Sequence, residues 1–415
     1  MSAARCAYTL LGYLLLPYAL LHLLLRSRKQ PAYLEHIGER LGYYTELPPK
    51  PVIWLHAVSV GETHAAQPLV RALRKAHPGH RVLLTHMTPT GRETSERLFG
   101  DGVLRCYLPY DFPQAVKRFL SHFKPVVGVL LETELWFNVI HLCRQAKIPL
   151  YLVNARLSEK SAAGYSHFRS LVSAGLNELI AVAAQTEADA LRLRALGAKD
   201  VQVTGNLKFD VQPPFYALEV GRELRSSFGA RPVFLAASTR IGEEELVLEA
   251  VSAAGVPGML TVIVPRHPQR FDEVAAILQR RGVRFQRRSE NQPVETDTQV
   301  VLGDSMGEMF AYYAACDAAF IGGSLLPLGG QNLLEACVMG KPVLIGPHTF
   351  NFAEASELAV QAGAAQRVPD AAGLGVALKA LFADEQKRKA MGEAGRAFCA
   401  AHLGATQKIL NLIRF

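Results

Sequence analysis

Two acidic motifs stand where the chain leaves predicted buried strands. The first is His56-Ala-Val-Ser-Val-Gly-Glu62-Thr63, and the second is Leu131-Glu132-Thr-Glu134-Leu-Trp136. A carboxylate in the first turn of a helix lies near the positive end of the helix dipole, which suits Glu62 to accept a proton. The alternative is a glutamate that only stabilises its helix. One of the two acids in the second motif can likewise be structural, and spacing does not say which.

Basic residues follow two further predicted strands. Lys208 lies in Thr204-Gly-Asn-Leu-Lys208-Phe-Asp210, and Arg266 lies in Val264-Pro265-Arg266-His267-Pro268. Lys208 could balance a carboxylate or a phosphate, although a solvent-exposed lysine paired with Asp210 explains the motif equally well. The guanidinium of Arg266 is suited to bidentate phosphate contact. Both halves of the chain therefore offer a cation at a strand end.

A glycine-rich stretch from Phe320 to His348 predicts a nucleotide site. Its glycines let the backbone approach a ligand, Asn332 stands at the start of a short helix, and Glu335 in the first turn can accept ribose hydroxyls. An ordinary strand-to-helix turn with many glycines is the alternative.

The turn Gly303-Asp-Ser-Met-Gly-Glu308 is a second place where backbone N–H groups and a carboxylate could meet a base or sugar. The alternative is that Asp304 or Ser305 only caps a helix beginning near Met306.

These motifs require a scaffold of alternating buried strands and amphipathic helices, which indicates parallel sheets covered on both faces. We expect an anchor at 1–30, two doubly wound domains at 31–212 and 213–405, and a closing helix at 406–415 that could pack on the first domain. Two such domains would face a cleft at the carboxyl ends of their strands. The predicted strands are Pro51–Val58, Arg81–Met87, Pro125–Leu131, Pro149–Asn154, Leu179–Ala184, Val201–Gly205, Pro232–Ala237, Leu260–Val264, Gln299–Gly303, Ala318–Gly322 and Pro342–Ile345.

The N-terminus predicts membrane attachment. Residues 6–25 carry no formal charge. This uncharged segment is about as long as a helix that crosses a bilayer. Arg26, Arg28 and Lys29 follow, a placement that keeps the downstream chain in the cytoplasm. Pro17 and His22 weaken a spanning helix, so a helix lying in one leaflet is the alternative.

The net charge, the cysteine spacing and the absence of certain motifs limit which functions the chain can have. The formal charge of +8 suits a membrane surface or anionic substrates, and no zinc-finger spacing, RNA motif or long Lys/Arg run indicates nucleic acid. The six cysteines are widely spaced and are interpreted as reduced thiols. Dinucleotide, Walker and Asp-x-Asp motifs do not occur, so we expect no metal and no organic cofactor.

Together the motifs make the chain resemble the 3-deoxy-D-manno-octulosonic acid (Kdo) transferases of bacterial lipopolysaccharide assembly. The resemblance covers nearly the whole chain in one order. Its blocks are the N-terminal anchor, Gly38–Gly42, His56–Thr63, His86–Gly91, Leu131–Asn138, Asn154–Ser158, Gly205–Asp210, Pro265–Pro268, Gly303–Glu308, the glycine-rich stretch and Gly346–Phe352.

The resemblance implies a GT-B fold, an α/β architecture of two Rossmann-like domains. It also implies metal-independent, inverting transfer of Kdo from CMP-Kdo to a lipid A precursor (lipid IVA) at the cytoplasmic side of the inner membrane. Glu62 matches the proton acceptor, and Glu132 and Lys208 match positions that stabilise the transition state. The implied CMP contacts are Pro265, Arg266, Met306, Gly307, Glu308, Asn332, Leu333, Leu334 and Glu335.

The chain departs from the family pattern at three positions. Gln331 and Leu333 replace an expected histidine and proline, and Phe137 replaces a proline. Gln331 cannot titrate near neutral pH, and Leu333 lacks the preset φ of proline. Two other functions stay open: a GT-B transferase or epimerase acting on a UDP-sugar, and a non-catalytic membrane-tethered scaffold.

Overall fold

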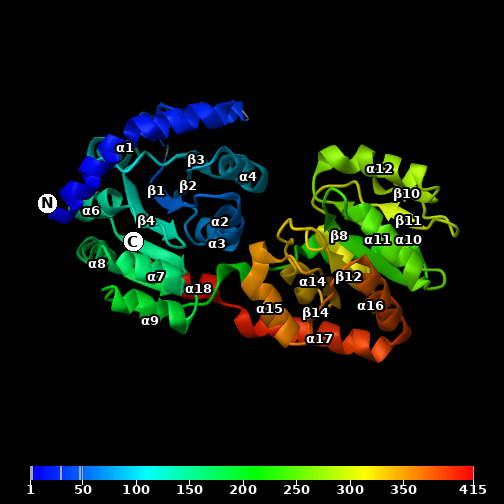
Figure 1. Cartoon of the computed structure of the whole chain (residues 1–415). Helices are drawn as coiled ribbons and strands as arrows, with labels where there is room; N and C mark the ends of the chain where they lie inside the picture. Colours follow the sequence, from blue (N-terminus) through cyan, green and yellow to red (C-terminus); the bar gives the residue numbers. More distant parts are fainter. Residues whose placement is uncertain (1–2, 29, 46–47, 49, 415) are drawn as a thin grey trace. The chain divides into compact units, whose positions relative to one another are not determined.

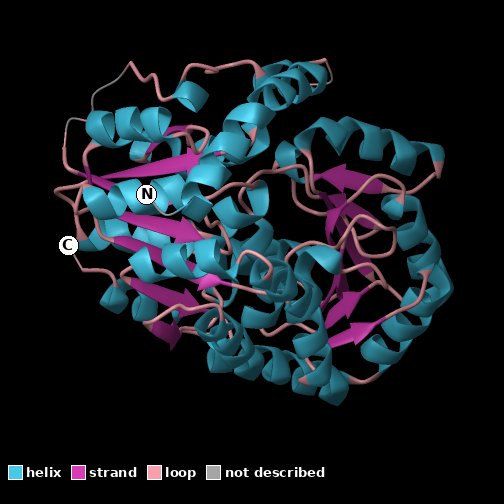
Figure 2. Cartoon of the chain, turned by 60° about the vertical axis from the view of Figure 1, so that its left-hand side comes forward, coloured by secondary structure: helices cyan, strands magenta, loops and turns pink. Residues whose placement is uncertain are grey.

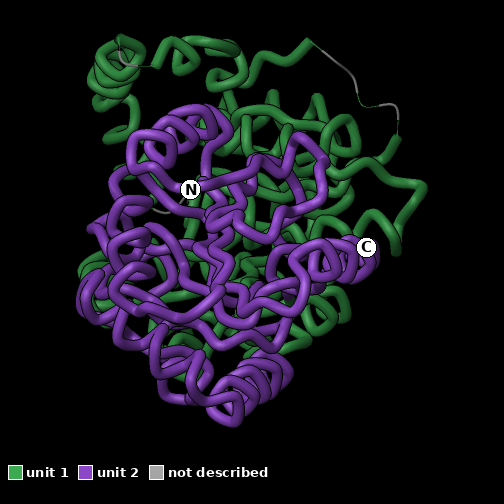
Figure 3. Tube along the Cα trace, turned by 90° about the vertical axis from the view of Figure 1, so that its right-hand side faces the viewer, with its two compact units in different colours: residues 1–210, 403–415 green, residues 211–402 purple. Residues whose placement is uncertain are grey.

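The computed structural model describes residues 3–28, 30–45, 48 and 50–414. The chain divides into two compact units, which are coloured separately in Figure 3. Unit 1 comprises residues 1–210 and 403–415, and unit 2 comprises residues 211–402. Each unit is a parallel β-sheet flanked by helices, as Figure 2 shows. The predicted fold class, two Rossmann-like α/β units, is confirmed.

The sheet of unit 1 runs in the order β3-β2-β1-β4-β5-β6-β7, with all neighbours parallel. Chain order reverses between β1 and β4, and open α/β sheets bind ligands at the carboxyl ends of strands at such a reversal. Glu62 follows β1, and Glu132 follows β4. The strands are β1 (Val52–His56), β2 (Arg81–His86), β3 (Leu104–Tyr107), β4 (Pro125–Leu131), β5 (Leu150–Ala155), β6 (Ala181–Ala184) and β7 (Val201–Val203).

Helices cover both faces of this sheet because its strands are apolar on both sides. β1 is buried at every position, and the two faces contribute to separate hydrophobic clusters. The helices of unit 1 are α1 (Ala3–Ser27), α2 (Val60–Ala65), α3 (Gln67–Ala76), α4 (Pro89–Phe99), α5 (Pro113–Phe123), α6 (Phe137–Gln145), α7 (Glu159–Ser166), α8 (Arg169–Glu178), α9 (Glu187–Ala195) and α18 (Ala405–Leu412), with 3-10 turns η1 (Pro31–Tyr33), η2 (Glu39–Leu41), η3 (Gly100–Gly102) and η4 (Leu207–Phe209).

The chain's last helix, α18, returns to unit 1 and packs against α3. Ala405, Ile409 and Ile413 are buried in the same hydrophobic cluster as one face of the unit 1 sheet. The carboxylate of Asp210 fixes this return by accepting hydrogen bonds from the backbone N–H groups of Gly404, at 2.7 Å, and Thr406. Asp210 therefore joins the two segments of unit 1, since it ends the segment 1–210 and binds the start of the segment 403–415.

The sheet of unit 2 runs in the order β10-β11-β9-β8-β12-β13-β14, again parallel throughout. Its strands are β8 (Val233–Thr239), β9 (Leu260–Pro265), β10 (Phe285–Arg287), β11 (Val300–Leu302), β12 (Ala318–Ile321), β13 (Val343–Ile345) and β14 (Ala365–Arg367).

Helices also cover the sheet of unit 2 (Figure 1). They are α10 (Phe215–Phe228), α11 (Glu243–Ala254), α12 (Phe271–Arg280), α13 (Met309–Ala315), α14 (Leu334–Val338), α15 (Ala353–Gln361), α16 (Ala371–Ala383) and α17 (Glu385–His402), with 3-10 turns η5 (Pro268–Arg270), η6 (Arg288–Glu290) and η7 (Phe350–Phe352).

Every strand expected from the sequence is present, but β3, β10 and β14 were not predicted. All three are short, and all three lie at sheet edges. β10 is only half-buried at each position, so it lacks the continuous apolar run by which the central strands were recognised.

Among the described residues, α1 is the one helix that is long and apolar enough to cross a membrane by length and composition. Arg26 lies in its last turn, and Arg28 follows the helix directly. Lys29, which the charge argument also used, and Phe415, at the end of the predicted closing helix, lie outside the described residues.

Candidate active site

Glu62 is held at the carboxyl end of β1 by its own turn. Ser59 caps α2, and the Glu62 carboxylate accepts hydrogen bonds from the backbone N–H of Val58, at 2.8 Å, and from the Ser59 hydroxyl, at 3.0 Å. Only 7% of Glu62 is exposed. The residue therefore does stabilise its helix, as the simpler interpretation required, and its orientation is fixed by the same two bonds.

The electrostatic surroundings of Glu62 suit a proton acceptor. Burial raises its pKa to about 7, the bond from Val58 opposes this rise, and the negative charges of Glu132 and Glu134 add to it. A general base works best when its pKa lies near the working pH. Glu62 thus combines a fixed position with a pKa suited to proton transfer near neutrality.

The second acidic motif lies beside the first because β4 is the neighbour of β1. Glu132 adopts φ +57°, a left-handed conformation that is uncommon for a residue with a side chain and is concentrated at functional sites. Its N–H donates to the carbonyl of Val153 at 2.9 Å. Trp136 and His56 have ring centroids 6.1 Å apart, so the two motifs are in contact.

Glu134 is the second acid of this motif, and burial raises its pKa, with the charge of Glu132 acting in the same direction. Among the described residues, no ion pair includes Glu62, Glu132 or Glu134. The carboxyl ends of β1 and β4 therefore bring three acidic side chains close enough to influence one another's pKa.

Lys208 lies on η4, which packs against α2. The Asn206 side chain accepts a hydrogen bond from the Lys208 N–H at 3.0 Å, and the Asn154 side chain accepts one from the Leu207 N–H at 2.9 Å. Asn154 was not predicted as a site residue. Asn154 is fully buried with φ +53°. A polar amide within an otherwise apolar strand is the signal that could have identified it.

In unit 2, Arg266 follows β9, and its N–H donates to the carbonyl of Thr239 at 2.9 Å. Asn332 donates to the Glu335 carboxylate at 3.2 Å and accepts from the Leu334 N–H at 3.1 Å. Burial raises the pKa of Glu335, whereas the bond from Asn332 and the positive charge of Arg266 act to lower it. The structure thus brings these predicted CMP contacts together.

Two of the predicted contacts differ from the rest. Leu333 and Leu334 are 1% and 0% exposed, so their side chains pack inside unit 2 and do not face solvent. The helix that follows, α14, is five residues long.

The turn between β11 and α13 is held by arginines of β10 and η6. Arg287 Nε donates to Asp304 at 2.6 Å, and Arg288 donates to Glu308 at 3.1 Å, while the Ser305 hydroxyl also donates to Glu308. Helix α13 begins at Met309 without a side-chain cap, so Asp304 and Ser305 do not serve as its caps.

Two of the predicted contacts, Met306 and Gly307, lie within this turn. Met306 is 58% exposed, and Gly307 adopts φ +82°. A residue with a side chain would be strained at position 307, so the sharp bend there depends on glycine.

The glycine-rich loop after β12 is fastened by Glu243, a residue that the sequence argument missed. Its buried carboxylate accepts the N–H groups of Gly323, at 2.5 Å, Leu325, at 3.1 Å, and Arg240, at 2.9 Å. A Cβ on Gly322 would lie 2.4 Å from the Ser238 carbonyl oxygen, so this loop runs too close to β8 for a side chain. The run Glu243-Glu-Glu at a helix start was the available signal, and it is equally typical of helix stabilisation.

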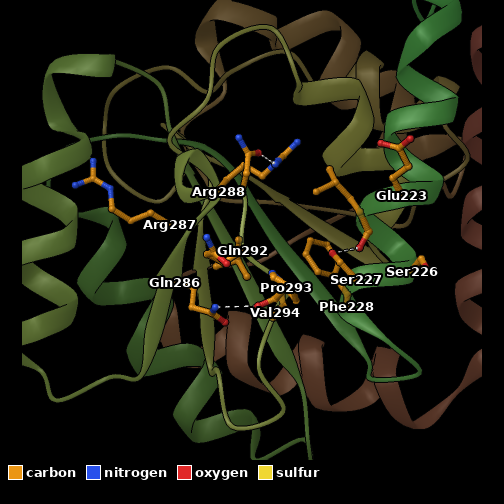
Figure 4. Close-up of a pocket in the computed structure, with 13 residues that line it drawn as sticks. Glu223, Ser226, Ser227, Phe228, Gln286, Arg287, Arg288, Gln292, Pro293 and Val294 are labelled. Atoms are coloured by element: carbon orange, nitrogen blue, oxygen red, sulfur yellow. Dashed lines mark hydrogen bonds between the residues drawn. The ribbon is translucent and has the colours of Figure 1, made fainter.

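A cavity of about 530 Å³ lies between α10 and the β10–β11 connection of unit 2 (Figure 4). None of the predicted site residues lines it. It is joined to the predicted site through Arg288, which lines the cavity and pairs with Glu308. The lining residues are Glu223, Leu224, Ser226, Ser227, Phe228, Gln286, Arg287, Arg288, Asn291, Gln292, Pro293, Val294 and Val301.

Comparison with known proteins decides the family. The family model described as 3-deoxy-D-manno-octulosonic-acid transferase (kdotransferase) matches residues 35–211. A 3-deoxy-D-manno-octulosonic acid transferase of Bordetella pertussis is 47% identical over 386 residues, covering 90% of this chain and 89% of that protein. The chain belongs to the Kdo transferase family. A Kdo transferase of Haemophilus influenzae is 38% identical over 99% of this chain and 98% of that protein.

Solved structures agree with the GT-B fold. A glycosyltransferase from Rickettsia africae is 14% identical, with a TM-score of 0.55, and the match covers 88% of this chain and 98% of that one. At this level of identity the likeness shows the fold alone. Membership of the Kdo transferase family makes the chain a glycosyltransferase and speaks against both the UDP-sugar enzyme and the non-catalytic scaffold.

Proposed function

We propose that this Kdo transferase moves Kdo from CMP-Kdo to a lipid A precursor, lipid IVA, with inversion of configuration and without a metal ion. The observation that carries the proposal is the buried Glu62 carboxylate, fixed by Val58 and Ser59 with its pKa raised to about 7. In this proposal, Glu62 takes the proton of a sugar hydroxyl on the acceptor as that oxygen attacks the anomeric carbon of Kdo.

The other two catalytic residues proposed in unit 1, Glu132 and Lys208, stabilise charges that develop during the reaction. Glu132 orients the sugar or stabilises positive charge that develops at the anomeric carbon, and Lys208 offsets negative charge on the departing phosphate. The contact of η4 with α2 and the adjacency of β1 and β4 support a joint role for these residues.

The CMP moiety is assigned to unit 2. Arg266 binds the phosphate, and Asn332 with Glu335 binds the ribose, with Pro265, Met306, Gly307, Glu308 and the backbones of Leu333 and Leu334 completing the contacts. Support comes from the charge of Arg266 acting on Glu335 and from the loop held by Glu243. CMP carries a single phosphate, so a basic side chain can balance it without the metal that a diphosphate usually requires.

We also propose that the protein is attached to the cytoplasmic side of the inner membrane through residues 1–30. The apolar α1, followed by Arg28, supports this attachment. It would place the enzyme beside its anionic lipid acceptor.

The test is one incubation of the full-length protein with CMP-Kdo and a tetra-acylated lipid A precursor, followed by product mass. A mass increase of one or more Kdo residues is expected, and release of CMP without a change in lipid mass would contradict the acceptor. Calorimetry with CMP and UDP tests the donor: binding of CMP but not UDP is expected, and the reverse preference would return the UDP-sugar enzyme as the better assignment.

A further inference from the structure

The buried and half-buried residues of α1 lie on one side of the helix. They recur at intervals of three and four, as residues on one face of a helix do. The helix packs against α6, α8 and η1, and Figure 1 shows its N-terminal half beside α6. The covered residues are Ala4, Arg5, Tyr8, Thr9, Gly12, Leu16, Ala19, Leu20, Leu23 and Ser27.

Polar bonds fasten this face to unit 1. The Tyr8 hydroxyl donates to the Asp111 carboxylate at 2.9 Å, and the Thr9 hydroxyl donates to the Asn138 side chain at 3.1 Å. Asp111 is buried and also accepts the backbone N–H groups of Asn138, at 3.0 Å, and Val139, at 2.8 Å. One buried carboxylate therefore joins α1 to the start of α6.

Aromatic contacts extend the same attachment. The ring of Tyr13 stacks on Phe112 with centroids 4.6 Å apart, and its hydroxyl donates to Gln114 at 2.8 Å. Tyr8 meets the edge of Phe137 at 5.2 Å. A Cβ on Gly12 would lie 3.2 Å from the Phe112 ring, so α1 and the chain before α5 approach closely.

The opposite face of α1 is apolar and exposed. Its large side chains are each about half exposed or more: Leu10 62%, Leu11 55%, Leu14 69%, Leu15 51%, Tyr18 67%, Leu21 54%, Leu24 51% and Leu25 49%. Such a long stripe of leucines on a helix surface is typical of a face that meets another apolar phase.

We propose that α1 does not cross the membrane but lies in the plane of its surface as a fixed part of unit 1, with the exposed leucine stripe in the lipid. This inference rests on the membrane attachment proposed above and specifies its geometry. A spanning α1 would leave the buried Asp111 without Tyr8 and would carry the hydroxyls of Tyr8 and Thr9 into hydrocarbon.

The bilayer is a better occupant of the stripe than a second copy of the chain. Arg26 lies in the last turn of the helix and Arg28 follows it. The chain's formal charge is +8, which complements anionic lipid headgroups and opposes pairing of two copies. Tyr13 and Tyr18, 43% and 67% exposed, are of the type enriched at membrane–water interfaces.

Cys6 provides a direct test with the full-length protein. It is exposed on α1, whereas Cys106, Cys143, Cys316, Cys337 and Cys399 are buried. A membrane-impermeant maleimide should label Cys6 in inside-out inner-membrane vesicles and not in right-side-out ones, and Cys6→Ser should abolish the signal. Labelling from the periplasmic side would show that α1 spans, and labelling only after detergent would place Cys6 within lipid; either result would overturn the proposal.

Cross-linking tests the attachment to unit 1. In the Cys6→Ser background, Tyr13→Cys with Gln114→Cys should be joined by a short bismaleimide in intact membranes, because the native side chains are in hydrogen-bond contact. The matched control is Tyr18→Cys with Gln114→Cys, since Tyr18 lies in the exposed stripe. Equal cross-linking of both pairs, or of neither, would contradict a docked helix.

Fractionation separates this inference from the proposed function. Full-length protein that stays in the high-speed supernatant without detergent would end the proposed membrane attachment and with it the in-plane helix. Membrane-bound protein labelled from the periplasm would end the in-plane helix only, and Kdo transfer is measured independently of both results.

Discussion

The carboxylates at the strand ends of the two units have opposite surroundings. In unit 1, Glu62 lies near two other acids, and burial raises its pKa to about 7. In unit 2, Asp304 and Glu308 each pair with an arginine. An acid near other acids can exchange a proton near neutral pH, whereas an acid paired with a cation stays charged and holds a loop in place. The contrast agrees with the proposal that proton transfer belongs to unit 1 and donor positioning to unit 2.

Replacing Glu62 with Gln should have the largest effect. Glutamine keeps the size of the side chain but cannot accept the proton, so we expect kcat to fall by about 10²–10⁴ while CMP binding by calorimetry is unchanged. Glu93→Gln, at an exposed position of α4, is the matched control. Activity within a few-fold of the parent enzyme would remove Glu62 from its role as base.

The pH dependence should be the next largest effect. Because the base must be ionised and its pKa is raised to about 7, kcat/KM should decrease as pH falls below that value. The expected decrease is about tenfold per unit, or about a hundredfold at pH 5. Residual activity of Glu62→Gln should lack this acid limb. An unchanged profile in that variant would assign the limb to another group.

Arg288→Gln should weaken donor binding without altering the chemical step. The variant loses the charge-assisted bond to Glu308, and we expect KM for CMP-Kdo to rise about tenfold with kcat little changed. Arg288→Lys should recover part of the loss, and Arg281→Gln, which breaks exposed ion pairs, should behave as the parent enzyme. A fall in kcat with constant KM would contradict a positioning role confined to the donor.

Glu243→Gln should give the smallest effect. Glutamine retains one oxygen acceptor for the three N–H groups that Glu243 binds, so the free energy of unfolding should fall by about 1 kcal/mol. Urea unfolding of the full chain measures this change, with Glu249→Gln, at an exposed position of the same helix, as the control. No change relative to Glu249→Gln would show that the glycine loop does not depend on this carboxylate.

Much of the fold could be predicted because central parallel strands carry their signal locally. The range expected for β4, Pro125–Leu131, is the range observed, since an uninterrupted apolar run is distinctive on its own. β10 was missed because an edge strand with three half-buried residues has no such run. Its recognition requires the neighbouring β11, which follows in the chain after a turn and a loop.

The candidate site was predicted in the same uneven way. Glu62, Glu132, Lys208 and Arg266 stand at strand ends, so their types and positions were visible in the sequence. Their roles remain proposals. Asn154 and Glu243 were not recognised because their importance lies in backbone groups distant in sequence: Asn154 accepts from Leu207, and Glu243 accepts from Gly323.

The sequence by itself determined the family, the two α/β units and the residue types at the strand ends, because each depends on local motifs and on the order of apolar runs. Only the tertiary structure decided how those residues behave. Burial of Glu62 beside the acids of β4 raises its pKa, and pairing with β10 and η6 fixes the acids of unit 2. The composition of α1 allows a spanning or a surface helix, and only the tertiary structure shows the Tyr8–Asp111 bond on which the proposed surface helix rests. Charge and solvation depend on neighbours that folding brings together, and the linear sequence does not specify those neighbours.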